Sequence, residues 1–388
     1  MLCYTLSNLR GKSYYDPEWD TLLDQIDYSD STVQSQLVDL LYYGAYKTGE
    51  LTAVGKISTK DYDGPAGFST FMDQNPEFLM NAYCSEVIIA SSFNQDLAKE
   101  MGETVGQEAL TYGLSGWYAP GMDMHRSPFG GRNFEYYSED GVLTGKISSS
   151  VLSGSYDEGC YAYIKHFAMN EQETHRMLGS MWANEQAIRE VYLKPFEIAV
   201  KEARGTLKYT SDSKGTKSTK VMRAATAVMT SFTMIGTTMC SSNYALTNTV
   251  LRDEWGFEGM VITDFGPAVN KDAMVRAGND FLLNANWGGK IPAFSAVFAD
   301  TTSNTAKHAF RTAIKNMCYT TVNSNAFNHI APGSTSYRDL APWRVLFNWL
   351  TALFAILAAT GAGFTIYRYI DFHKNPNKYK EKKQKEEK

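Results

Sequence analysis

Five short apolar runs in this 388-residue sequence are each followed by polar or charged side chains. The runs have the length and composition of buried strands, and the residues that follow the strands of a barrel gather on one rim. Three acids and three bases among them could act together. They are Asp63, Arg132, Glu135, Lys165, His166 and Asp264. The pattern therefore predicts one site built from several distant segments.

These residue types suit the binding and cleavage of a sugar. Sugar hydroxyls both donate and accept, so they need acceptors such as Asp63 and donors such as Arg132, Lys165 and His166. Asp264 follows the apolar run MVIT, where nearby cations would keep its carboxylate ionised. An anionic carboxylate is what a nucleophile on an anomeric carbon requires. The aromatic content of 13% is compatible with stacking on sugar rings.

The elements that must position these residues alternate between strand and helix. Strands are expected at 51–57, 116–120, 161–164, 225–230, 260–263 and 280–283. Helices are expected at 31–46, 86–110, 137–156, 184–203, 243–255 and 304–322. Such alternation indicates an α/β fold with a parallel sheet, and the number of units favours a (β/α)8 TIM-like barrel. Residues 206–220, rich in Ser, Thr and Lys, are expected to be a surface excursion.

Six motifs, in this order, resemble glycoside hydrolase family 3 in its β-glucosidase branch. They are DGPAGF, GWYAPGMDMHRSPFGGRNFEYYSED, IKHFAMNEQE, NEQAIREVYLKPFE, AVMTSF and LRDEWGFEGMVITDF. The resemblance covers about residues 14–328. It implies a (β/α)8-like barrel that hydrolyses terminal non-reducing β-D-glucosyl or related residues with retention, through a covalent glycosyl-enzyme.

The resemblance also implies a role for individual residues. The catalytic nucleophile is Asp264, by its position in the VITD segment. The residues that hold the sugar are Asp63, Arg132, Lys165 and His166, with Met229 and Phe232 in the wall of the subsite. Glu135 and Glu139 are expected to orient the arginine and the lysine.

Departures from the family pattern bear on substrate preference. Phe265 stands where the family often has a tryptophan, and Phe232 and Thr233 stand where it often has tyrosine and asparagine. The branch that removes N-acetylglucosamine carries a KHFPGHG-like loop, where this chain has KHFAMNEQE. We therefore expect the reaction to be kept and that specificity to be absent.

The acid/base of the reaction has no clear place in the sequence. A retaining glycosidase needs a second carboxyl about 5–5.5 Å from the nucleophile. In the family's β-glucosidases it usually comes from a sandwich domain, which we expect this chain to lack and a separate domain or chain to supply. Candidates inside the barrel are Glu171, Glu173 and His175.

Two other readings of the same residues stay open. The first is a non-catalytic or incomplete barrel that binds sugar at a membrane surface. The second is an aldolase in which Lys165 forms a Schiff base with its substrate. Both keep the barrel and differ in what the site does with its ligand.

Charge, cysteine and histidine patterns argue against several other classes. The net charge is −5, and because residues 368–388 carry +4, the remainder is acidic at −9, without a basic patch. This argues against a nucleic-acid partner. The cysteines are scattered, which indicates thiols and not a disulfide framework; they are Cys3, Cys84, Cys160, Cys240 and Cys318. No HExxH motif occurs, and no metal or other cofactor is expected.

The C-terminal region predicts a membrane anchor. Residues 345–367 are apolar except for Asn348. A helix of this length can cross a hydrocarbon core of about 30 Å. A Lys-rich tail follows, and positive flanks stay in the cytoplasm. We expect a barrel at 1–330, a linker at 331–342, a transmembrane helix at 343–370 and a cytoplasmic tail at 371–388. The barrel would lie on the extracellular side of the cell membrane, and no signal peptide is expected at the N-terminus.

Overall fold

The computed structural model describes the chain except for residues 1–3, 71, 73–79, 267–268, 335–341 and 381–388. The chain forms two units, Met1–Thr335 and Ser336–Lys388. Cys3, most of the expected linker and the end of the expected tail lie outside the described residues. Each unit is described by itself below.

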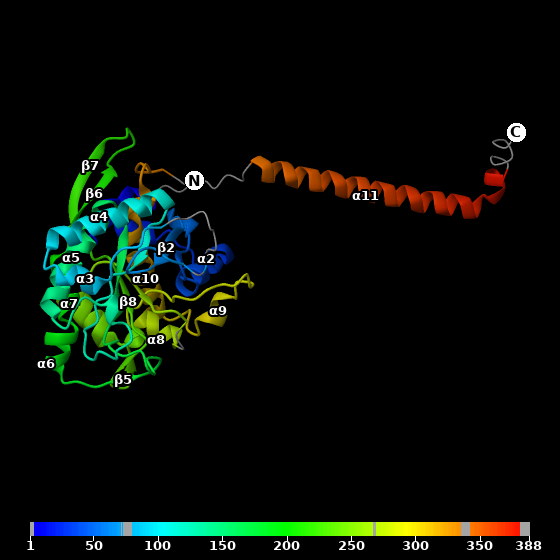
Figure 1. Cartoon of the computed structure of the whole chain (residues 1–388). Helices are drawn as coiled ribbons and strands as arrows, with labels where there is room; N and C mark the ends of the chain where they lie inside the picture. The colour runs from blue at the N-terminus through cyan, green and yellow to red at the C-terminus, as the bar shows by residue number, and fades with distance from the viewer. Residues whose placement is uncertain (1–3, 71, 73–79, 267–268, 335–341, 381–388) are drawn as a thin grey trace. The chain divides into compact units, whose positions relative to one another are not determined.

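A six-stranded sheet forms the centre of the first unit (Figure 1). Its order is β1-β2-β3-β4-β8-β11. The bounds are β1 Lys47–Thr48, β2 Thr59–Asp63, β3 Gly116–Tyr118, β4 Tyr161–Phe167, β8 Ala227–Thr230 and β11 Met260–Thr263. Neighbours from β2 to β11 run parallel, whereas β1 is antiparallel to β2. Strands β3, β4, β8 and β11 are buried along their whole length, as expected of parallel strands covered on both faces.

Two irregular segments, residues 43–46 and 280–284, close the sheet into a barrel-like ring, and we call them the seam. Phe281 bridges to β11 in parallel orientation. The amide of Gly44 donates to the 280–284 segment over 3.0 Å, and the carbonyl of Tyr46 accepts from β2 over 3.0 Å. A Cβ on Gly44 would lie 2.5 Å from the Phe281 ring, so only glycine fits at this contact.

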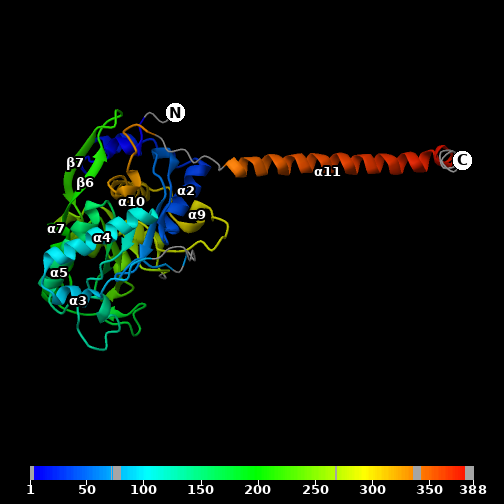
Figure 2. The same ribbon diagram turned by 45° about the horizontal axis from the view of Figure 1, so that its top comes forward.

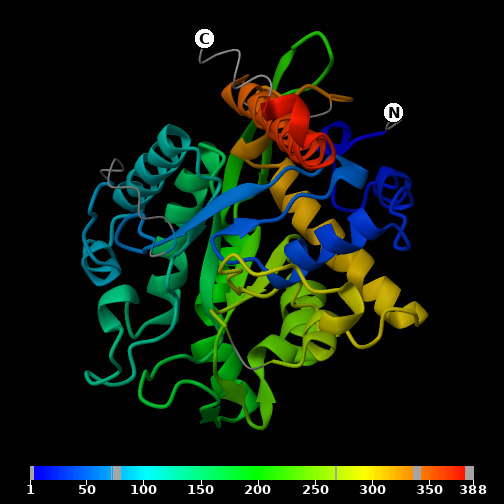
Figure 3. The same cartoon turned by 90° about the vertical axis from the view of Figure 1, so that its right-hand side faces the viewer.

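Helices surround the ring (Figures 2 and 3). The α-helices of this unit are α1 Glu18–Leu23, α2 Ser31–Tyr42, α3 Glu86–Ser91, α4 Gln95–Tyr112, α5 Gly141–Asp157, α6 Glu185–Ala187, α7 Lys194–Glu202, α8 Lys271–Arg276, α9 Phe294–Val297 and α10 Asn304–Val322. Ile188–Tyr192 and Ala245–Glu254 are π-helical. In Figure 3, α4 and α5 lie on one side of the strands and α10 on the other.

Local signals in the sequence start these helices and let them pack. Asp30, Asn94 and Asp140 cap α2, α4 and α5 by accepting hydrogen bonds from two backbone amides each. Glycines allow α4 and α5 to approach closely. A Cβ on Gly102 or Gly154 would lie 2.1 Å from a backbone oxygen of the opposite helix.

The predicted elements are largely present, and two predicted strands are wrong. Residues 51–57 contain the 3-10 turn Thr52–Val54, which ends at Gly55 with a φ of 72°, and β2 follows it. Residues 280–283 form no regular strand and belong to the seam. The central sheet therefore has five mutually parallel strands in the described part of the chain, where a (β/α)8 barrel has eight. The fold is a barrel-like α/β fold with a half-barrel sheet.

Residues 206–220 form most of a hairpin, a surface excursion between α7 and β8 as expected. Strands β6 Arg204–Thr210 and β7 Lys217–Arg223 pair antiparallel. Leu207 and Tyr209 turn toward the body, and Lys208 between them is exposed. This alternation of apolar and polar residues covers too few positions to predict a strand from the sequence. The hairpin contains six cationic residues and one acidic residue, so the expectation of a body without a basic patch is wrong. In Figure 1 it lies at the end opposite β5 (Ser180–Met181).

The second unit contains one helix, α11 Pro342–Lys374, in its described part. Trp343–Lys374 is long and apolar enough to cross a membrane, with a mean hydropathy of 1.8 in its most apolar window. No residue of that window is buried. The helix agrees in position with the predicted segment 343–370, and the evidence for a membrane is its length and composition.

Candidate active site

A cavity of about 500 Å³ opens where the strands of the sheet end. Asp63 is the last residue of β2, and Asp264 comes directly after β11. The cavity gathers every residue predicted to react with or hold the sugar. These are Asp63, Arg132, Lys165, His166, Met229, Phe232 and Asp264. Side chains from five separate strands and loops thus meet at one rim, as active-site groups do in barrels.

A bulge in β4 delivers two adjacent residues to the cavity. Neighbouring side chains of a regular strand point to opposite faces. The pairing of β4 with β8 shifts register between Ile164 and Phe167. Such an irregularity re-aims side chains, and both Lys165 and His166 line the cavity.

Charged groups form a chain across one wall of the cavity. Lys165 Nζ lies 3.0 Å from Asp63 Oδ1 and 3.1 Å from Glu135 Oε1. Arg132 donates to the same glutamate through Nε at 2.6 Å and Nη2 at 2.7 Å. Glu135 therefore orients both cations, in agreement with the role expected of it, and the fork-to-fork geometry fixes the guanidinium plane.

The pKa values in this chain of charges reflect burial and pairing. Burial would raise the pKa of Glu135, but Lys165 and Arg132 outweigh it and lower that pKa to about 2. Burial likewise disfavours the charged form of Lys165, but Asp63 and Glu135 raise its pKa above the ordinary value. Lys165 is therefore an ammonium at neutral pH. A Schiff-base lysine needs a neutral amine, so the aldolase reading loses its support.

His166 is neutral and held from behind. Burial, followed by the charges of Arg132 and Lys165, places its pKa well below the ordinary value. Asp123 Oδ2 accepts from the backbone N of His166 over 2.8 Å and lies 3.2 Å from its Nδ1. Nε2 lies 3.7 Å from Asp264 Oδ2. Asp123 therefore fixes the ring while the other nitrogen faces the cavity.

Asp264 lines the cavity, and one of its carboxylate oxygens is hydrogen-bonded to the backbone. Its Oδ1 accepts from the amide of Phe265 over 2.6 Å. Burial raises the pKa of Asp264 to about 6, and the Phe265 amide, Lys165 and Arg132 counteract part of that rise. Above this pH Asp264 is a carboxylate, the form that a nucleophile needs. The nearby cations stabilise its negative charge.

The cavity also includes residues that the sequence reasoning missed. They are Tyr46, Tyr118, Arg176, Met177, Phe265 and Leu283. Tyr118 ends β3, so the strand-end rule that identified Asp63 could have found it. Arg176 follows Lys165 and His166 in the loop after β4, and it lies 4.8 Å from the ring centre of Phe232. Leu283 ends the predicted strand 280–283, so the same rule could have found it, whereas no pattern in the sequence points to Tyr46.

The expected second supporting residue does not reach the cavity. Glu139 is exposed and makes no ion pair within the described residues, so the expectation that it orients Arg132 or Lys165 is wrong. Its neighbour Asp140 caps α5, which turns this part of the chain outward. Glu135 holds both cations without it.

The three acid/base candidates inside the barrel lie outside the cavity wall. Glu171 is buried, and both of its oxygens lack a hydrogen-bond partner in the described part of the chain. Glu173 pairs with Arg176 over 2.8 Å and lies 3.6 Å from Arg132. His175 is exposed. None of the three presents a carboxyl or imidazole to Asp264 in this structure.

A barrel-like domain with paired cations and carboxylates at one rim can both donate hydrogen bonds to a polar ligand and accept them from it. Comparison with known proteins agrees with this class. Residues 82–211 match the glycosyl hydrolase family 3 N terminal domain. The chain is therefore similar to glycosyl hydrolase family 3 over this segment, and the relatives that it matches are named beta-glucosidases.

Three relatives illustrate the extent of the similarity. Beta-glucosidase A of Butyrivibrio fibrisolvens is 34% identical over 62% of this chain and 26% of its own length. The beta-glucosidase of Paenibacillus barengoltzii superposes with a TM-score of 0.68 at 28% identity, over 86% of this chain and 36% of that one. Beta-glucosidase 3B of Thermotoga neapolitana in complex with glucose superposes with a TM-score of 0.63 at 29% sequence identity. The superposition covers 80% of this chain and 43% of that one. The chain thus spans about a quarter of the curated relative's length.

Proposed function

We propose that this chain hydrolyses terminal non-reducing β-D-glucosyl or related β-glycosyl residues with retention of configuration. The observation that carries the proposal is the convergence of Asp63, Arg132, Lys165, His166 and Asp264 on one cavity. The names of the relatives support the substrate class.

In the proposed mechanism the charged wall holds the sugar and Asp264 reacts with it. Asp63 keeps one oxygen for sugar hydroxyls while the other accepts from Lys165. Arg132 donates to hydroxyl oxygens, and Nε2 of the neutral His166 accepts from a sugar hydroxyl, because the ring proton lies on Nδ1 beside Asp123. The carboxylate of Asp264 attacks the anomeric carbon, the bond to the leaving oxygen breaks, and a covalent glycosyl-enzyme forms. Water then releases the sugar from Asp264 with the original configuration.

We further propose that the proton for the leaving oxygen comes from a carboxyl outside this barrel, on a separate domain or chain. The support is that Glu171, Glu173 and His175 do not line the cavity. The cavity volume of about 500 Å³ exceeds that of one sugar ring, which leaves space for such a group.

Labelling with 2-deoxy-2-fluoro-glucosyl fluoride tests the reaction separately from the acid/base. Fluoride leaves without a proton, so the first step depends on the nucleophile. We expect intact mass to show one added sugar and peptide mapping to find it on Asp264. Asp264→Asn should remove the adduct, and Asp253→Asn, an exposed matched control, should keep it. An adduct elsewhere, or none on folded protein, would contradict the proposal.

The same experiment separates hydrolysis from mere binding. A barrel that only binds sugar would show glucose binding by calorimetry and no adduct with the activated fluoride. A barrel that reacts but lacks its proton donor would form the adduct and release it slowly. External azide should then accelerate the release, because an anionic nucleophile needs no general base.

We also propose that α11 anchors the protein in the cell membrane, with the barrel outside and the Lys-rich tail in the cytoplasm. The support is the length and apolar composition of Trp343–Lys374 and the cluster of lysines after it. Alkaline carbonate washing should leave the full chain in the membrane fraction. Cysteine-accessibility labelling at positions 214 and 376 should then place the two sites on opposite sides. Release by carbonate, or labelling from the same side, would refute the anchor or its orientation.

A further inference from the structure

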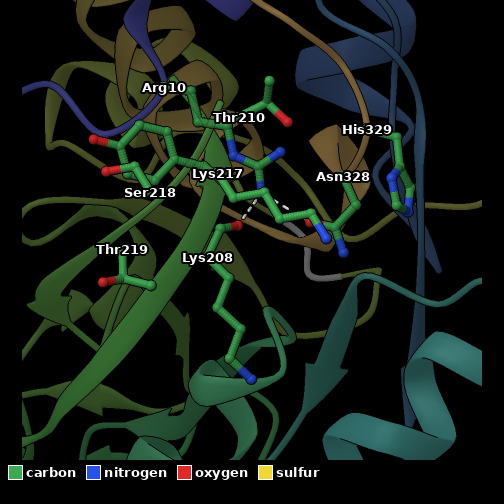
Figure 4. Close-up of a pocket in the computed structure, with 9 residues that line it drawn as sticks. Arg10, Lys208, Thr210, Lys217, Ser218, Thr219, Asn328 and His329 are labelled. Atoms are coloured by element: carbon green, nitrogen blue, oxygen red, sulfur yellow. Dashed lines mark hydrogen bonds between the residues drawn. The ribbon is translucent and has the colours of Figure 1, made fainter. Parts of the chain in front are cut away.

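A second and larger cavity, of about 660 Å³, lies beside the β6–β7 hairpin (Figure 4). Its wall is made by Arg10, residues 208–210 of β6, residues 217–219 of β7, and Asn328 with His329. The hairpin lies at the end of the unit opposite β5, and β5 follows the strand that carries Lys165 and His166 (Figure 1). This cavity is therefore separate from the candidate active site, and none of its lining residues is shared with it.

The wall of this cavity offers donors and no carboxylate. Every described residue that lines it carries a cationic, hydroxyl, amide or imidazole side chain. Lys217 makes no ion pair among the described residues. Lys208 contributes less, because its Nζ lies 3.4 Å from Glu158 and points away from Arg10 in Figure 4. Such a surface is suited to a ligand rich in acceptor oxygens.

Arg10 is a buried cation without an acidic partner. It is 6% exposed, and its Nη2 donates to the carbonyl of Ser324 over 3.0 Å and to Asn328 Oδ1 over 2.9 Å. Its Nε and Nη1 have no hydrogen-bond partner in the described part of the chain. Burial lowers the pKa of Arg10 to about 10. A buried charge that is paired with neutral oxygens alone is costly, and an anion beside it would offset that cost.

We propose that this cavity binds the phosphate group of an anionic organic ligand. Arg10 and Lys217 supply the positive charge that a tetrahedral oxyanion requires. Arginine suits phosphate because its planar donors can reach two oxygens at once. The cavity volume exceeds that of a phosphate ion, so the ligand carries an organic part, for which the ring of Tyr209 provides an apolar surface. This site does not rest on the proposed hydrolysis.

The test is calorimetry on the full chain in a zwitterionic detergent, with sn-glycerol 1-phosphate as the probe. Saturating glucose is present throughout to occupy the candidate active site, which also contains cations. We expect binding at one site per chain. Lys217→Ala should weaken it roughly tenfold, the value of one charge-assisted hydrogen bond. Lys214→Ala, at the hairpin tip and outside the cavity wall, should leave it unchanged.

Arg10→Gln should abolish binding while keeping a donor of similar size. If that variant does not fold, the comparison of Lys217→Ala with Lys214→Ala decides alone, because both lysines are exposed. No binding of the probe would overturn the proposal. So would equal weakening by both lysine variants, which indicates diffuse attraction.

A second arm distinguishes the source of the phosphate group. Short-chain phosphatidylglycerol and short-chain phosphatidylcholine, both below their micelle concentrations, compete with the probe. Displacement by the anionic lipid alone, lost in Lys217→Ala, indicates a lipid headgroup. Failure of both lipids to displace the probe indicates a soluble phosphate ester. Either result supports the phosphate site, and displacement by both lipids alike would contradict a site that recognises the anion.

Discussion

The ionisation of Asp264 gives the sharpest test of the proposed chemistry. Its pKa is about 6 because burial outweighs the Phe265 amide and the nearby cations. As a raised carboxyl pKa, it leaves the group neutral below pH 6 and anionic above it. The anionic fraction is roughly one tenth at pH 5 and nine tenths at pH 7, so labelling by 2-deoxy-2-fluoro-glucosyl fluoride should accelerate about tenfold across that interval.

The charges around Asp264 predict how this profile moves. Lys165 lowers the pKa of Asp264, so Lys165→Met should shift the rise in labelling rate to higher pH as well as weaken sugar binding. The readout is the pH at which the rate is half maximal, which a merely destabilised protein would not move. A labelling rate that stays flat between pH 5 and pH 7 would refute the reasoning, because the reacting group would then not be the one that titrates.

The raised pKa of Asp264 also affects the stability of the fold. A rise in pH that favours labelling should destabilise the folded state. Relative to its ordinary value of 3.8, the folded-state pKa is raised, so Asp264 favours the folded state at low pH. That contribution is lost as the pH rises toward 6. Asp264→Asn should therefore increase the free energy of unfolding above pH 6, by at most about 3 kcal/mol, and have little effect below pH 4. Urea unfolding at the two pH values measures both.

Three further predictions concern the wall and the scaffold. Glu135→Gln leaves Arg132 and Lys165 without their shared buried partner, so it should lower the free energy of unfolding by about 3–5 kcal/mol in a urea titration. The exposed control Glu139→Gln should change that free energy by less than about 0.5 kcal/mol. Similar losses for both variants would contradict the role given to Glu135. Lys165→Met should reduce the second-order rate of labelling by roughly a hundredfold at its optimal pH, since two hydrogen bonds to the charged wall are lost, and an unchanged rate would remove Lys165 from the site. Gly154→Ala should cost about 1–3 kcal/mol, because the new Cβ would lie 2.1 Å from an α4 carbonyl, and thermal unfolding as stable as the parent would show that the two helices can separate freely.

The parts of the site that the sequence could predict follow single strands. Asp264 was identifiable because four buried residues precede it, and Lys165 and His166 because they follow the apolar start of β4. The bulge that turns both of those side chains into the cavity depends on pairing with β8, which is distant in sequence. Sequence patterns along one strand cannot report it.

The missed features depend on contacts between distant segments. Residues 280–284 are apolar enough to resemble a strand, but their hydrogen bonds go to an irregular partner, so no ladder forms. The short apolar run at 51–57 contains Gly55, whose positive φ ends a turn. Glu139 has the right charge for a supporting role, and the direction of the chain toward α5 takes it away.

The seam makes the ligand cavity a property of the closed ring. Tyr46 and Leu283 lie in the two segments of the seam, and both line the cavity. Their segments are more than 230 positions apart in the chain, so closing the loop between them has a large entropic cost. We therefore expect this contact to form only when the intervening strands are in place. A sugar that fills the cavity binds the closed ring and not an opened one, and binding energy is thereby linked to closure. The amides of Gly44 and Ala45 consequently act as reporters of occupancy, exchanging their hydrogens more slowly as glucose is added.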